Sequence, residues 1–561
     1  MLTSRGIVFM SKKKASDVFV ECLENEGTEY VFAVPGEENL DIVESLRTSK
    51  IKLIVNRHEQ GSAFMAATYG RLTGKVGVCM STLGPGATNL VTGVAYAQLG
   101  GMPLLAITGQ KGIRENWQGN FQIIDVIGMM KPLTKNAVSI KGPKMISQEI
   151  RSAFKLATTE RQGACHIELP EDVASEDVDT AFGPHTPGVL RRPNADAKAI
   201  ALAADKIRKA KHPVIIVSSR AQRRKVSAAL KKFCDGTNVY VIHTQLGKGV
   251  LGDDHKNSLF AFGIHKKDYV NCVVEKADLI ITVGYATIEH PPSVWNTDLK
   301  KEILHIDFTP AEPEIFYEPS VELVGDVSAS LDALRRALPG FKHTGTYEEK
   351  IKKDLEERLF VEGSTDDSFP MKPRRIVADC RKVLGKEDII CMDNGIYKMW
   401  FSRHYKTFGI TTFLIDNTLA TMGAGLPSAM GAQLVHPKKK VLAVCGDGGF
   451  MMNSQELETA VRLKLPVVVL ILNDNAYGFI KWKQQNFKFG DFGLDLGNPD
   501  FVKYAQAYGA KGYRVTKAES LVPILEKAFR QRGPVIVECA IDYSENKKVW
   551  NQELDTFTCP T

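Results

Sequence analysis

Residues 440–478 read KVLAVCGDGGFMMNSQELETAVRLKLPVVVLILNDNAYG, and this stretch decides the fold of its region. Residues 440–445 and 467–472 are short apolar runs typical of buried strands, and residues 455–463 between them predict a helix. The stretch is therefore a βαβ unit with parallel, adjacent strands. Asp447 and Asp474 follow these strands directly, so we expect both carboxylates at one carboxyl edge of a sheet, where open α/β folds bind ligands.

The two carboxylates predict a magnesium site. Mg²⁺ prefers hard oxygen ligands and completes an octahedral shell with water and phosphate oxygens. Gly446, Gly448 and Gly449 let backbone N–H groups approach a phosphate, and the start of the following helix favours its negative charge. The alternative is that Gly-Asp-Gly is only a turn, which is the commoner meaning of so short a motif by itself. The Asn-Asp pair after the next strand favours a magnesium diphosphate anchor.

A second position of interest is Glu59, in the segment Arg57-His58-Glu59-Gln60. Residues 51–55 predict a short strand and residues 63–72 a helix, which places Glu59 at the helix start. A glutamate at this position can take part in catalysis, or it can be a charge stabilised by the helix dipole without a part in chemistry.

The two regions resemble each other. In residues 75–107 a strand, a glycine-rich turn, a helix and a second strand follow in the same order as in residues 440–470. This weak internal repeat predicts two similarly folded α/β domains. The turn at residues 82–89 is not a dinucleotide fingerprint, because Asn89 stands where the pattern needs glycine.

The middle of the chain predicts a third sheet. Residues 213–217, 239–242, 279–284 and 303–307 are apolar runs that alternate with helical segments, as in a Rossmann-like domain. Linkers are expected near residues 182–194 and 338–373. We therefore predict an α/β protein with three doubly wound parallel sheets, in domains at residues 11–182, 195–338 and 373–545.

Bulk properties exclude several classes. The net charge of +7 arises from 72 basic and 65 acidic residues spread along 561, and the densest basic patch, residues 220–225, lacks aromatic residues for stacking on bases, so nucleic acid is not expected. The 10 cysteines lack a CxxC pair and suit reduced thiols in a cytoplasmic protein. No apolar run is long enough to span a bilayer, the patch at residues 6–10 is too short for a signal peptide, and Met10 is an alternative start.

The GDG and N[DN] elements resemble the thiamine diphosphate (ThDP) motif. The stretches VFAVPGEENL, NRHEQGSAFMAATYGRLTG, STLGPGATNLVTG and LLAITGQ, together with residues 393–543, resemble the acetolactate synthase (acetohydroxyacid synthase) large-subunit family, in particular its catabolic-like branch. This resemblance implies a pyrimidine-binding domain first, a middle domain, and a diphosphate-binding domain last. It also implies active sites between two subunits, hence a homodimer or tetramer, and leaves a small regulatory subunit open.

The resemblance assigns roles residue by residue. The metal would be held by Asp447, Asp474 and the carbonyl of Ala476, while Glu59 would hydrogen-bond the aminopyrimidine and activate the cofactor. Met422 would support the bent cofactor, although a methionine filling a core gap is the alternative. Catalytic roles are implied for Glu59, Phe121 and Gln122, and a substrate pocket for Gln110, Phe479, Ile480 and Lys483. The implied cofactor contacts are Glu59, Pro85, Gly395, Ala420, Met422, Gly446, Asp447, Gly448, Gly449, Asp474, Tyr477 and Gly478.

The chain also departs from that family. Residues 395–397, Gly-Ile-Tyr, replace the usual Gln-His or Ser-His near the diphosphate. Glu37 and Glu38 would repel a 2-keto acid unless they point away or are neutralised. Trp482 is offset by one residue from the tryptophan that selects 2-ketobutyrate, so pyruvate is the favoured acceptor and 2-ketobutyrate an open one. Residues 284–289 resemble the FAD-free members, so FAD is possible but not favoured.

The implied function is ThDP- and Mg²⁺-dependent decarboxylation of pyruvate, followed by joining of the remaining two-carbon unit to a second 2-keto acid, which gives 2-acetolactate and CO₂. The alternatives are another ThDP-dependent decarboxylase, oxidase or carboligase, and a ThDP-fold protein without activity. Residues 486–498 are expected to close over the site as a lid.

Overall fold

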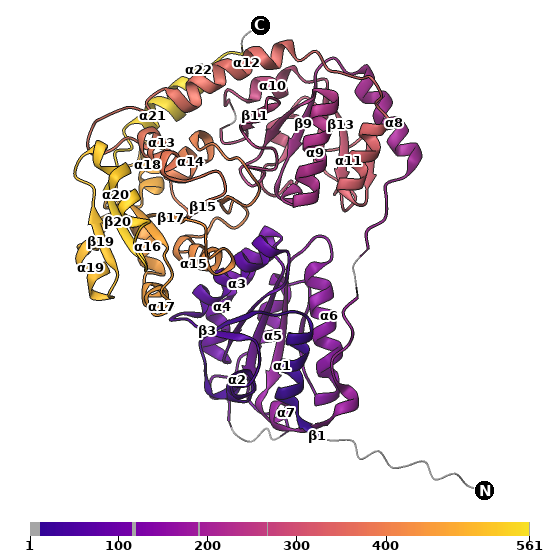
Figure 1. Cartoon of the computed structure of the whole chain (residues 1–561), viewed down its shortest axis with the longest axis vertical. Helices are drawn as coiled ribbons and strands as arrows, with labels where there is room; N and C mark the ends of the chain where they lie inside the picture. The colour runs from indigo at the N-terminus through magenta and orange to yellow at the C-terminus, as the bar shows by residue number, and fades with distance from the viewer. Residues whose placement is uncertain (1–11, 115–118, 189–190, 266, 560–561) are drawn as a thin grey trace. The chain divides into compact units, whose positions relative to one another are not determined.

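The computed structural model describes residues 12–114, 119–188, 191–265 and 267–559, and the alternative start at Met10 lies outside them. Its contacts divide the chain into two compact units, one up to residue 190 and one from residue 191. Each unit is described by itself. The first contains one six-stranded sheet and the second contains two (Figure 1).

The sheet of the first unit is parallel, with the strand order β3-β2-β4-β5-β7-β6. Its strands are β2 (Tyr30–Ala33), β3 (Lys52–Val55), β4 (Gly77–Ser81), β5 (Leu104–Gln110), β6 (Ala137–Ser139) and β7 (Ala164–Pro170). Its helices are α1 (Ala15–Asn25), α2 (Leu40–Arg47), α3 (Glu59–Thr73), α4 (Gly84–Gly100), α5 (Val126–Met130), α6 (Ile146–Thr158) and α7 (Glu171–Ser175). A short antiparallel pair, β1 (Lys12–Lys14) with β8 (Asp177–Asp179), joins the two ends of this unit.

The second unit begins with the predicted Rossmann-like sheet, in the order β11-β10-β9-β12-β13-β14. Counted along the chain this is 3-2-1-4-5-6, the order of dinucleotide-binding folds. The strands are β9 (Pro213–Val217), β10 (Tyr240–His243), β11 (Ser258–Ala261), β12 (Leu279–Val283), β13 (Glu302–Asp307) and β14 (Val321–Val324). The helices are α8 (Ala197–Lys209), α9 (Arg224–Thr237), α10 (Asn271–Lys276) and α11 (Val327–Arg336).

The third sheet has the order β16-β15-β17-β18-β20-β19 and is again parallel. Its strands are β15 (Ile389–Met392), β16 (Phe413–Leu414), β17 (Val441–Gly446), β18 (Val468–Asn473), β19 (Lys511–Arg514) and β20 (Val535–Ala540). Its helices are α13 (Pro373–Val383), α14 (Tyr397–His404), α15 (Gly425–Val435), α16 (Asp447–Met452), α17 (Glu456–Arg462), α18 (Gly478–Asn486), α19 (Phe501–Ala507), α20 (Leu521–Ala528), α21 (Glu545–Lys548) and α22 (Leu554–Thr556).

The first and third sheets have the same topology. Numbered along each sheet, both orders read 2-1-3-4-6-5. The internal repeat in the sequence therefore extends to all six strands, and β4-α4-β5 corresponds to β17-α16-α17-β18. The predicted α/β class with three parallel sheets is confirmed, whereas the predicted domain limits stay predictions.

The βαβ unit has the predicted register. Gly446 at the end of β17 pairs with Leu472 at the end of β18, and Asp447 and Asn473 follow at the same edge. The helical segment between the strands is longer than predicted, because α16 starts at Asp447 itself and precedes α17. The carboxylate of Asp447 therefore lies in the first turn of a helix.

A buried polar network joins the two sheets of the second unit. The Asp253 carboxylate accepts hydrogen bonds from the Thr407 backbone N–H (2.7 Å) and hydroxyl (3.0 Å), and it contacts His243 Nε2 at 3.1 Å. Asp253 and His243 are both buried. Burial alone would raise the pKa of Asp253, but Lys248 and His243 outweigh it and hold that pKa below its ordinary value.

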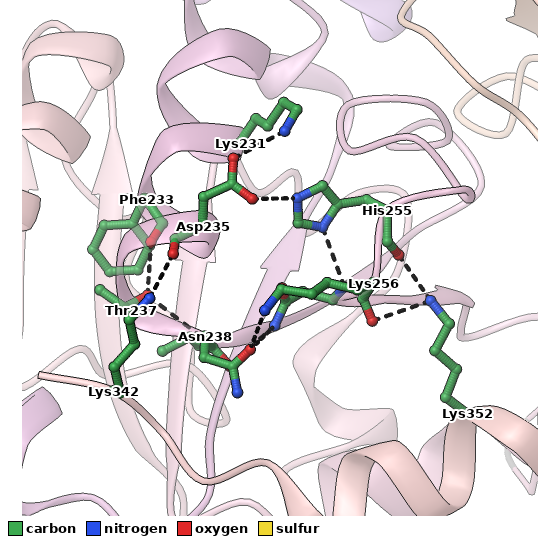
Figure 2. Close-up of polar contacts among 11 residues, drawn as sticks. Lys231, Phe233, Asp235, Thr237, Asn238, His255, Lys256, Lys342 and Lys352 are labelled. Carbon is green, nitrogen blue, oxygen red and sulfur yellow. Dashed lines mark hydrogen bonds and ion pairs between the residues drawn. The ribbon is translucent and has the colours of Figure 1, made fainter.

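The predicted linker at residues 338–373 contains helical segments and contacts the domain of the middle sheet. It contains α12 (Thr346–Glu356) and a π-helical turn, Glu357–Val361. Lys342 Nζ donates to the Asp235 carbonyl (2.7 Å), and Lys352 Nζ donates to the carbonyls of His255 (2.8 Å) and Lys256 (3.1 Å) (Figure 2). The linker is thus fastened to the C-terminal end of α9 and the turn before β11.

The expectation of reduced thiols is wrong for two of the 10 cysteines. Cys272 and Cys559 form a disulfide across 287 residues of sequence, while the other eight are buried and form no disulfide. The sequence could not indicate this pair, because its partners lie far apart and outside any recognisable spacing. Within the described part of the chain, no helix combines the length and apolarity needed to cross a membrane.

The Asp253 network gives a stability prediction. Asp253→Ala leaves His243 and the Thr407 N–H buried without their partner, so we expect the free energy of unfolding to fall by about 3–5 kcal/mol. The neighbouring Asp254 pairs with Lys386 at 2.7 Å on the surface, and Asp254→Ala should cost less than about 1 kcal/mol. Urea unfolding of both variants checks this, and equal losses would contradict the role of the network.

Candidate active site

The carboxyl edge of the third sheet encloses a cavity of about 90 Å³. Its walls come from the loop after β15, the start of α16 and the start of α18. The cavity brings together most of the predicted cofactor residues of this unit. Those in its wall are Gly395, Met422, Gly446, Asp447, Gly448, Gly449, Asp474, Ala476, Tyr477, Gly478, Phe479 and Ile480.

The two carboxylates are in an environment that demands a positive charge. Burial raises the pKa of Asp447. Burial, followed by the charge of Asp447, raises the pKa of Asp474 to about 7. The side-chain amide of Asn498 donates to Asp447 Oδ2 at 2.6 Å, which brings only a partial positive charge to this carboxylate. The donor set therefore fits a divalent cation.

The cation would need further ligands. Among the residues that the structure describes, no group of three His, Cys, Asp or Glu side chains could hold a metal. Two carboxylates with a backbone carbonyl leave positions for water and phosphate oxygens, which is the coordination that Mg²⁺ accepts. The residues present thus fit a metal that binds together with a diphosphate.

Two glycines keep this cradle open. A Cβ atom on Gly448 would lie 2.7 Å from Tyr477 Cε1, and one on Gly478 would lie 2.4 Å from Asp474 Oδ2. Any side chain there would displace an aromatic wall or a metal carboxylate. The backbone at both positions is therefore free to approach a ligand closely.

Tyr397 supplies an unpaired polar group. Its side chain lines the cavity, and its hydroxyl is buried with no hydrogen-bond partner in the described part of the chain. A buried unpaired hydroxyl is costly unless a ligand satisfies it. Tyr397 belongs to residues 395–397, where the family was expected to have Gln-His or Ser-His, so its hydroxyl is a candidate donor to a phosphate.

Asp393 connects two loops near the cavity, and the sequence assigned no role to it. It is buried at the end of β15, and its carboxylate accepts from the Gly423 N–H at 2.9 Å and the Asn394 N–H at 2.7 Å. Burial raises the pKa of Asp393 to about 6. The side chain thereby ties the loop that contains Met422 to the sheet edge.

The same loop contains a strained residue. Ala420 has φ of 53°, which non-glycine residues rarely adopt. Asp416 holds this conformation, since it accepts from the Ala420 N–H at 2.7 Å and from the Thr418 N–H at 3.0 Å. Such strain persists where the surroundings enforce it and is frequent at ligand sites. Ala420 itself is not in the wall of the cavity, whereas Met422 is.

The remaining predicted residues of this unit lie on α18. Lys483 is exposed, with its ammonium 5.5 Å from the Phe479 ring, and it is not in the cavity wall. Trp482 turns away from the cavity, and its indole N–H donates to Asn551 Oδ1 at 3.2 Å. The tryptophan is therefore not part of the cavity wall, although its ring packs against Phe479 with ring centroids 5.7 Å apart.

Glu59 is fixed at the start of α3 in the first unit. Its carboxyl group is buried, and Asn89 Nδ2 donates to its Oε2 at 3.0 Å. A Cβ atom on Gly86 would lie 3.2 Å from its Oε1, so the start of α4 packs against the glutamate. In the sequence, Asn89 stood out only as a mismatch to a dinucleotide motif. Its contact with Glu59 was not predicted.

The other predicted residues of the first unit lie near the ends of two other strands, β4 and β5. Gln110 closes β5 and donates from Nε2 to Glu168 Oε2 at 3.0 Å. Gln122 has φ of 60°, and its carbonyl oxygen lies 2.5 Å from the position of a Cβ on Gly84, beside Pro85 in the first turn of α4. Phe121 is 73% exposed. The structure thus places these groups near the turn after β4 or the end of β5.

The two acidic residues after β2 differ in their environment. Glu37 is exposed, whereas Glu38 is buried and contacts Lys111 Nζ at 2.8 Å and the Thr82 hydroxyl. Burial alone would raise the pKa of Glu38, but the hydrogen bonds from Lys111 and Thr82 outweigh it and lower that pKa. Lys111 therefore compensates the repulsion that Glu38 would exert on an anionic substrate.

At the carboxyl edge of the middle sheet, a side chain of the protein itself binds the polar groups that follow the strands. The Glu289 carboxylate accepts from the Ser218 hydroxyl (2.8 Å), the Thr244 hydroxyl (2.6 Å) and the Leu246 N–H (2.6 Å). These partners follow β9 and β10, at the edge where a Rossmann-like sheet binds a dinucleotide. The expectation that FAD is not required stays a prediction, and this internal carboxylate favours it.

Comparison with known proteins assigns the family. Three family models match in order: the N-terminal TPP binding domain of thiamine pyrophosphate enzymes at residues 13–129, their central domain at residues 200–334, and their C-terminal TPP binding domain at residues 393–539. The chain is 32% identical to an acetolactate synthase of Bacillus subtilis, with 97% of this chain and 96% of that protein covered. It is 34% identical to a catabolic acetolactate synthase of Raoultella terrigena, with 96% of each covered. It is 30% identical to an acetolactate synthase large subunit of Porphyra purpurea, with 96% of this chain and 93% of that protein covered.

The chain belongs to the acetolactate synthase family of ThDP enzymes.

The cofactor of this acetolactate synthase family member is therefore ThDP, the compound also called thiamine pyrophosphate. The first unit contains Glu59 and the second contains the diphosphate cavity. The similarity extends over all three sheets, and the resemblance inferred from the sequence is confirmed.

The raised pKa of Asp474 gives a pH prediction for the cofactor-free enzyme. Because the folded pKa is about 7 against an ordinary 3.8, protonated Asp474 stabilises the fold at low pH, and this contribution is lost as the pH rises from about 4 to 7. Asp474→Asn lacks this loss. We expect its Tm, measured relative to the wild type, to rise from pH 4.5 to 7 and to level off above.

Added ThDP and Mg²⁺ should raise the Tm of the wild type above that of Asp474→Asn at pH 8. The bound cation would stabilise the ionised wild-type carboxylate, whereas the asparagine variant would gain little. A difference in Tm between the two proteins that does not change between pH 4.5 and 8 would contradict the assigned environment of Asp474.

Proposed function

We propose that this ThDP enzyme is an acetolactate synthase, which converts two molecules of pyruvate to 2-acetolactate and CO₂. The observation that carries the proposal is the cavity after β17 and β18, which gathers Asp447, Asp474 and Met422 in one wall. Full-length similarity to acetolactate synthases supports the choice of reaction among ThDP chemistries. The acceptor is pyruvate, with 2-ketobutyrate as the alternative.

The second unit would hold the diphosphate end of the cofactor. Asp447, Asp474 and the carbonyl of Ala476 would bind Mg²⁺, which bridges to the diphosphate. The N–H groups at the start of α16 and the Tyr397 hydroxyl would donate to phosphate oxygens. When bound, ThDP supplies a nucleophilic carbon and an electron sink for decarboxylation.

Glu59 would hold the proton that controls the pyrimidine end. Asn89 already donates to Oε2, which leaves Oε1 for the aminopyrimidine nitrogen. The carboxyl group is thereby fixed in position before the cofactor binds. Asn89 is a positioning residue in this scheme, because it acts through Glu59.

The substrate would contact residues from both units. Phe479 and Ile480 present apolar surface beside the metal carboxylates, which favours loss of charge during decarboxylation. Gln110, Phe121 and Gln122 would orient the reacting carbonyl groups, and Lys483 would attract the anionic acid.

We also propose a homodimer as the smallest active form, with a tetramer as the larger alternative. The exposure of Phe121, Ile123 and Ile124 on the first unit supports burial by a second copy.

The first test of the function is the substitution Glu59→Gln. It keeps the hydrogen-bonding shape but removes the proton exchange, so we expect pyruvate consumption to fall by about 10²–10⁴-fold. The assay contains pyruvate, Mg²⁺ and ThDP, with and without FAD, and measures acetoin after acid treatment. Glu44→Gln, on the exposed part of α2, is the matched control and should retain activity.

The products decide between ThDP chemistries. Acetolactate supports the proposal. Acetaldehyde would instead indicate a decarboxylase, and acetyl phosphate with peroxide an oxidase. Undiminished pyruvate consumption by Glu59→Gln would refute the role of this glutamate, whichever product forms.

The second test concerns the shared site. Mixed dimers of Glu59→Gln and Asp447→Ala subunits are formed by coexpression. If each site takes its glutamate and its aspartate from different subunits, half of the dimers are mixed and each has one intact site. We then expect about a quarter of the wild-type activity, from statistical pairing of the subunits. No recovery above that of either parent would indicate that each site is built within one subunit.

A further inference from the structure

A disulfide connects two distant parts of the second unit. Cys272 lies in α10 beside the middle sheet, and Cys559 lies in the C-terminal tail, which we define as residues 541–559. Their Cα atoms are 5.3 Å apart, a separation that allows the bond without movement of the backbone. The other eight cysteines are buried and form no disulfide, so this pair is the single disulfide among the described residues.

The tail crosses from the active-site cavity to the middle sheet. It starts beside Tyr543, which lines the cavity. Trp550 is buried against Trp400 of α14, with ring centroids 5.2 Å apart. Further along, the Phe557 ring packs edge-on against Tyr269, with ring centroids at 4.5 Å, just before the disulfide. The bond therefore closes a path from the cavity to α10.

The tail also supports the helix that forms one wall of the cavity. Asn551 accepts a hydrogen bond from the Trp482 indole at 3.2 Å and donates one to Asn486 Oδ1 at 3.1 Å. Both partners belong to α18, whose first turn contributes Phe479 and Ile480 to the cavity wall. A second pocket of about 980 Å³ lies between α18 and the tail, and its wall includes Asp474. The position of the tail thus bears on the metal site.

We propose that Cys272 and Cys559 form a reversible redox latch, which fastens the tail and through it α18 and the cofactor cavity. With the bond closed, the tail is covalently attached to the middle sheet. With the bond open, its last residues are held by the contact of Phe557 with Tyr269 and by the Arg358 guanidinium. This group lies 5.0 Å from the centroid of the Tyr269 ring and 5.7 Å from that of the Phe557 ring. Oxidised enzyme binds ThDP and Mg²⁺ more tightly than reduced enzyme.

The exposure of the two sulfurs determines the direction of attack. Cys272 is 1% exposed, whereas Cys559 is only partly buried. The thiolate of a small thiol such as glutathione bonds to Cys559 Sγ, and the S–S bond breaks with its electron pair on Cys272 Sγ, which takes up a proton. A second thiolate attacks the sulfur of the small thiol, releases the Cys559 thiolate for protonation, and forms the small-molecule disulfide. The reverse reaction consumes one small-molecule disulfide and yields two small thiols.

The test compares oxidised and reduced enzyme of the full chain. Protein incubated with glutathione disulfide or with dithiothreitol is digested without reduction and analysed by mass spectrometry. Only the oxidised sample should contain the tail peptide joined to the peptide of α10. Reduction should lower the Tm by about 3 °C or more. It should also weaken binding of ThDP with Mg²⁺ at least about threefold, measured by calorimetry.

Two variants separate the latch from other effects of the reductant. Cys559→Ser should show the Tm and the cofactor affinity of the reduced wild type with or without dithiothreitol. Thr558→Ala changes the exposed neighbouring residue and should remain as sensitive to the reductant as the wild type. Absence of the joined peptide after oxidation, or equal cofactor affinity in the two states, would overturn the proposal. None of these measurements uses the product of the reaction, so they fail or succeed independently of the proposed function.

Discussion

The burial of two neighbouring carboxylates is the constraint on which the rest of the site depends. Asp447 and Asp474 lie at the ends of adjacent parallel strands, so the sheet itself holds them in one place. Burial disfavours their charges, and each charge disfavours the other, which raises the pKa of Asp474 to about 7. The fold thus maintains an electrostatic cost that a divalent cation with a diphosphate removes. If the pair holds the metal as proposed, cofactor binding and folding stability are coupled through it.

The repeated topology extends the same logic to the first unit. Because the first and third sheets share the strand order 2-1-3-4-6-5, each has a ligand edge where its third and fourth strands end. One edge carries the acidic pair for a metal and its diphosphate. In the first sheet Glu59 follows the second strand, β3, and Asn89, from the helix after the third strand, donates to its carboxylate. The repeated fold therefore carries different candidate functional residues at the carboxyl edges of its two sheets.

The sequence predicted what depends on local pattern and missed what depends on distant partners. Apolar runs gave the strands β9, β17 and β18 to within one residue at each end, and the strand-turn-helix order placed Asp447 and Asp474 at the same edge. Asp393, Asp416 and Asn498 were not identified, because an acid or amide in a loop shows its function only through the backbone or carboxylate that it contacts. The Lys111 partner of Glu38 and the disulfide partner of Cys272 were missed for the same reason.

The middle sheet gains a structural function from these contacts. Its strand order is that of a dinucleotide-binding fold, yet Glu289 satisfies the polar groups at its carboxyl edge. Residues of this domain instead hold α14: Gln245 accepts from the Ser402 hydroxyl at 3.1 Å, and Asp268 pairs with the buried Arg403 at 3.0 Å. Since α14 begins at Tyr397, whose hydroxyl lies unpaired at the diphosphate cavity, these anchors fix one wall of the cofactor site. A sheet of nucleotide-binding topology thus supports the helix that begins at the cavity, and its part in this site is structural.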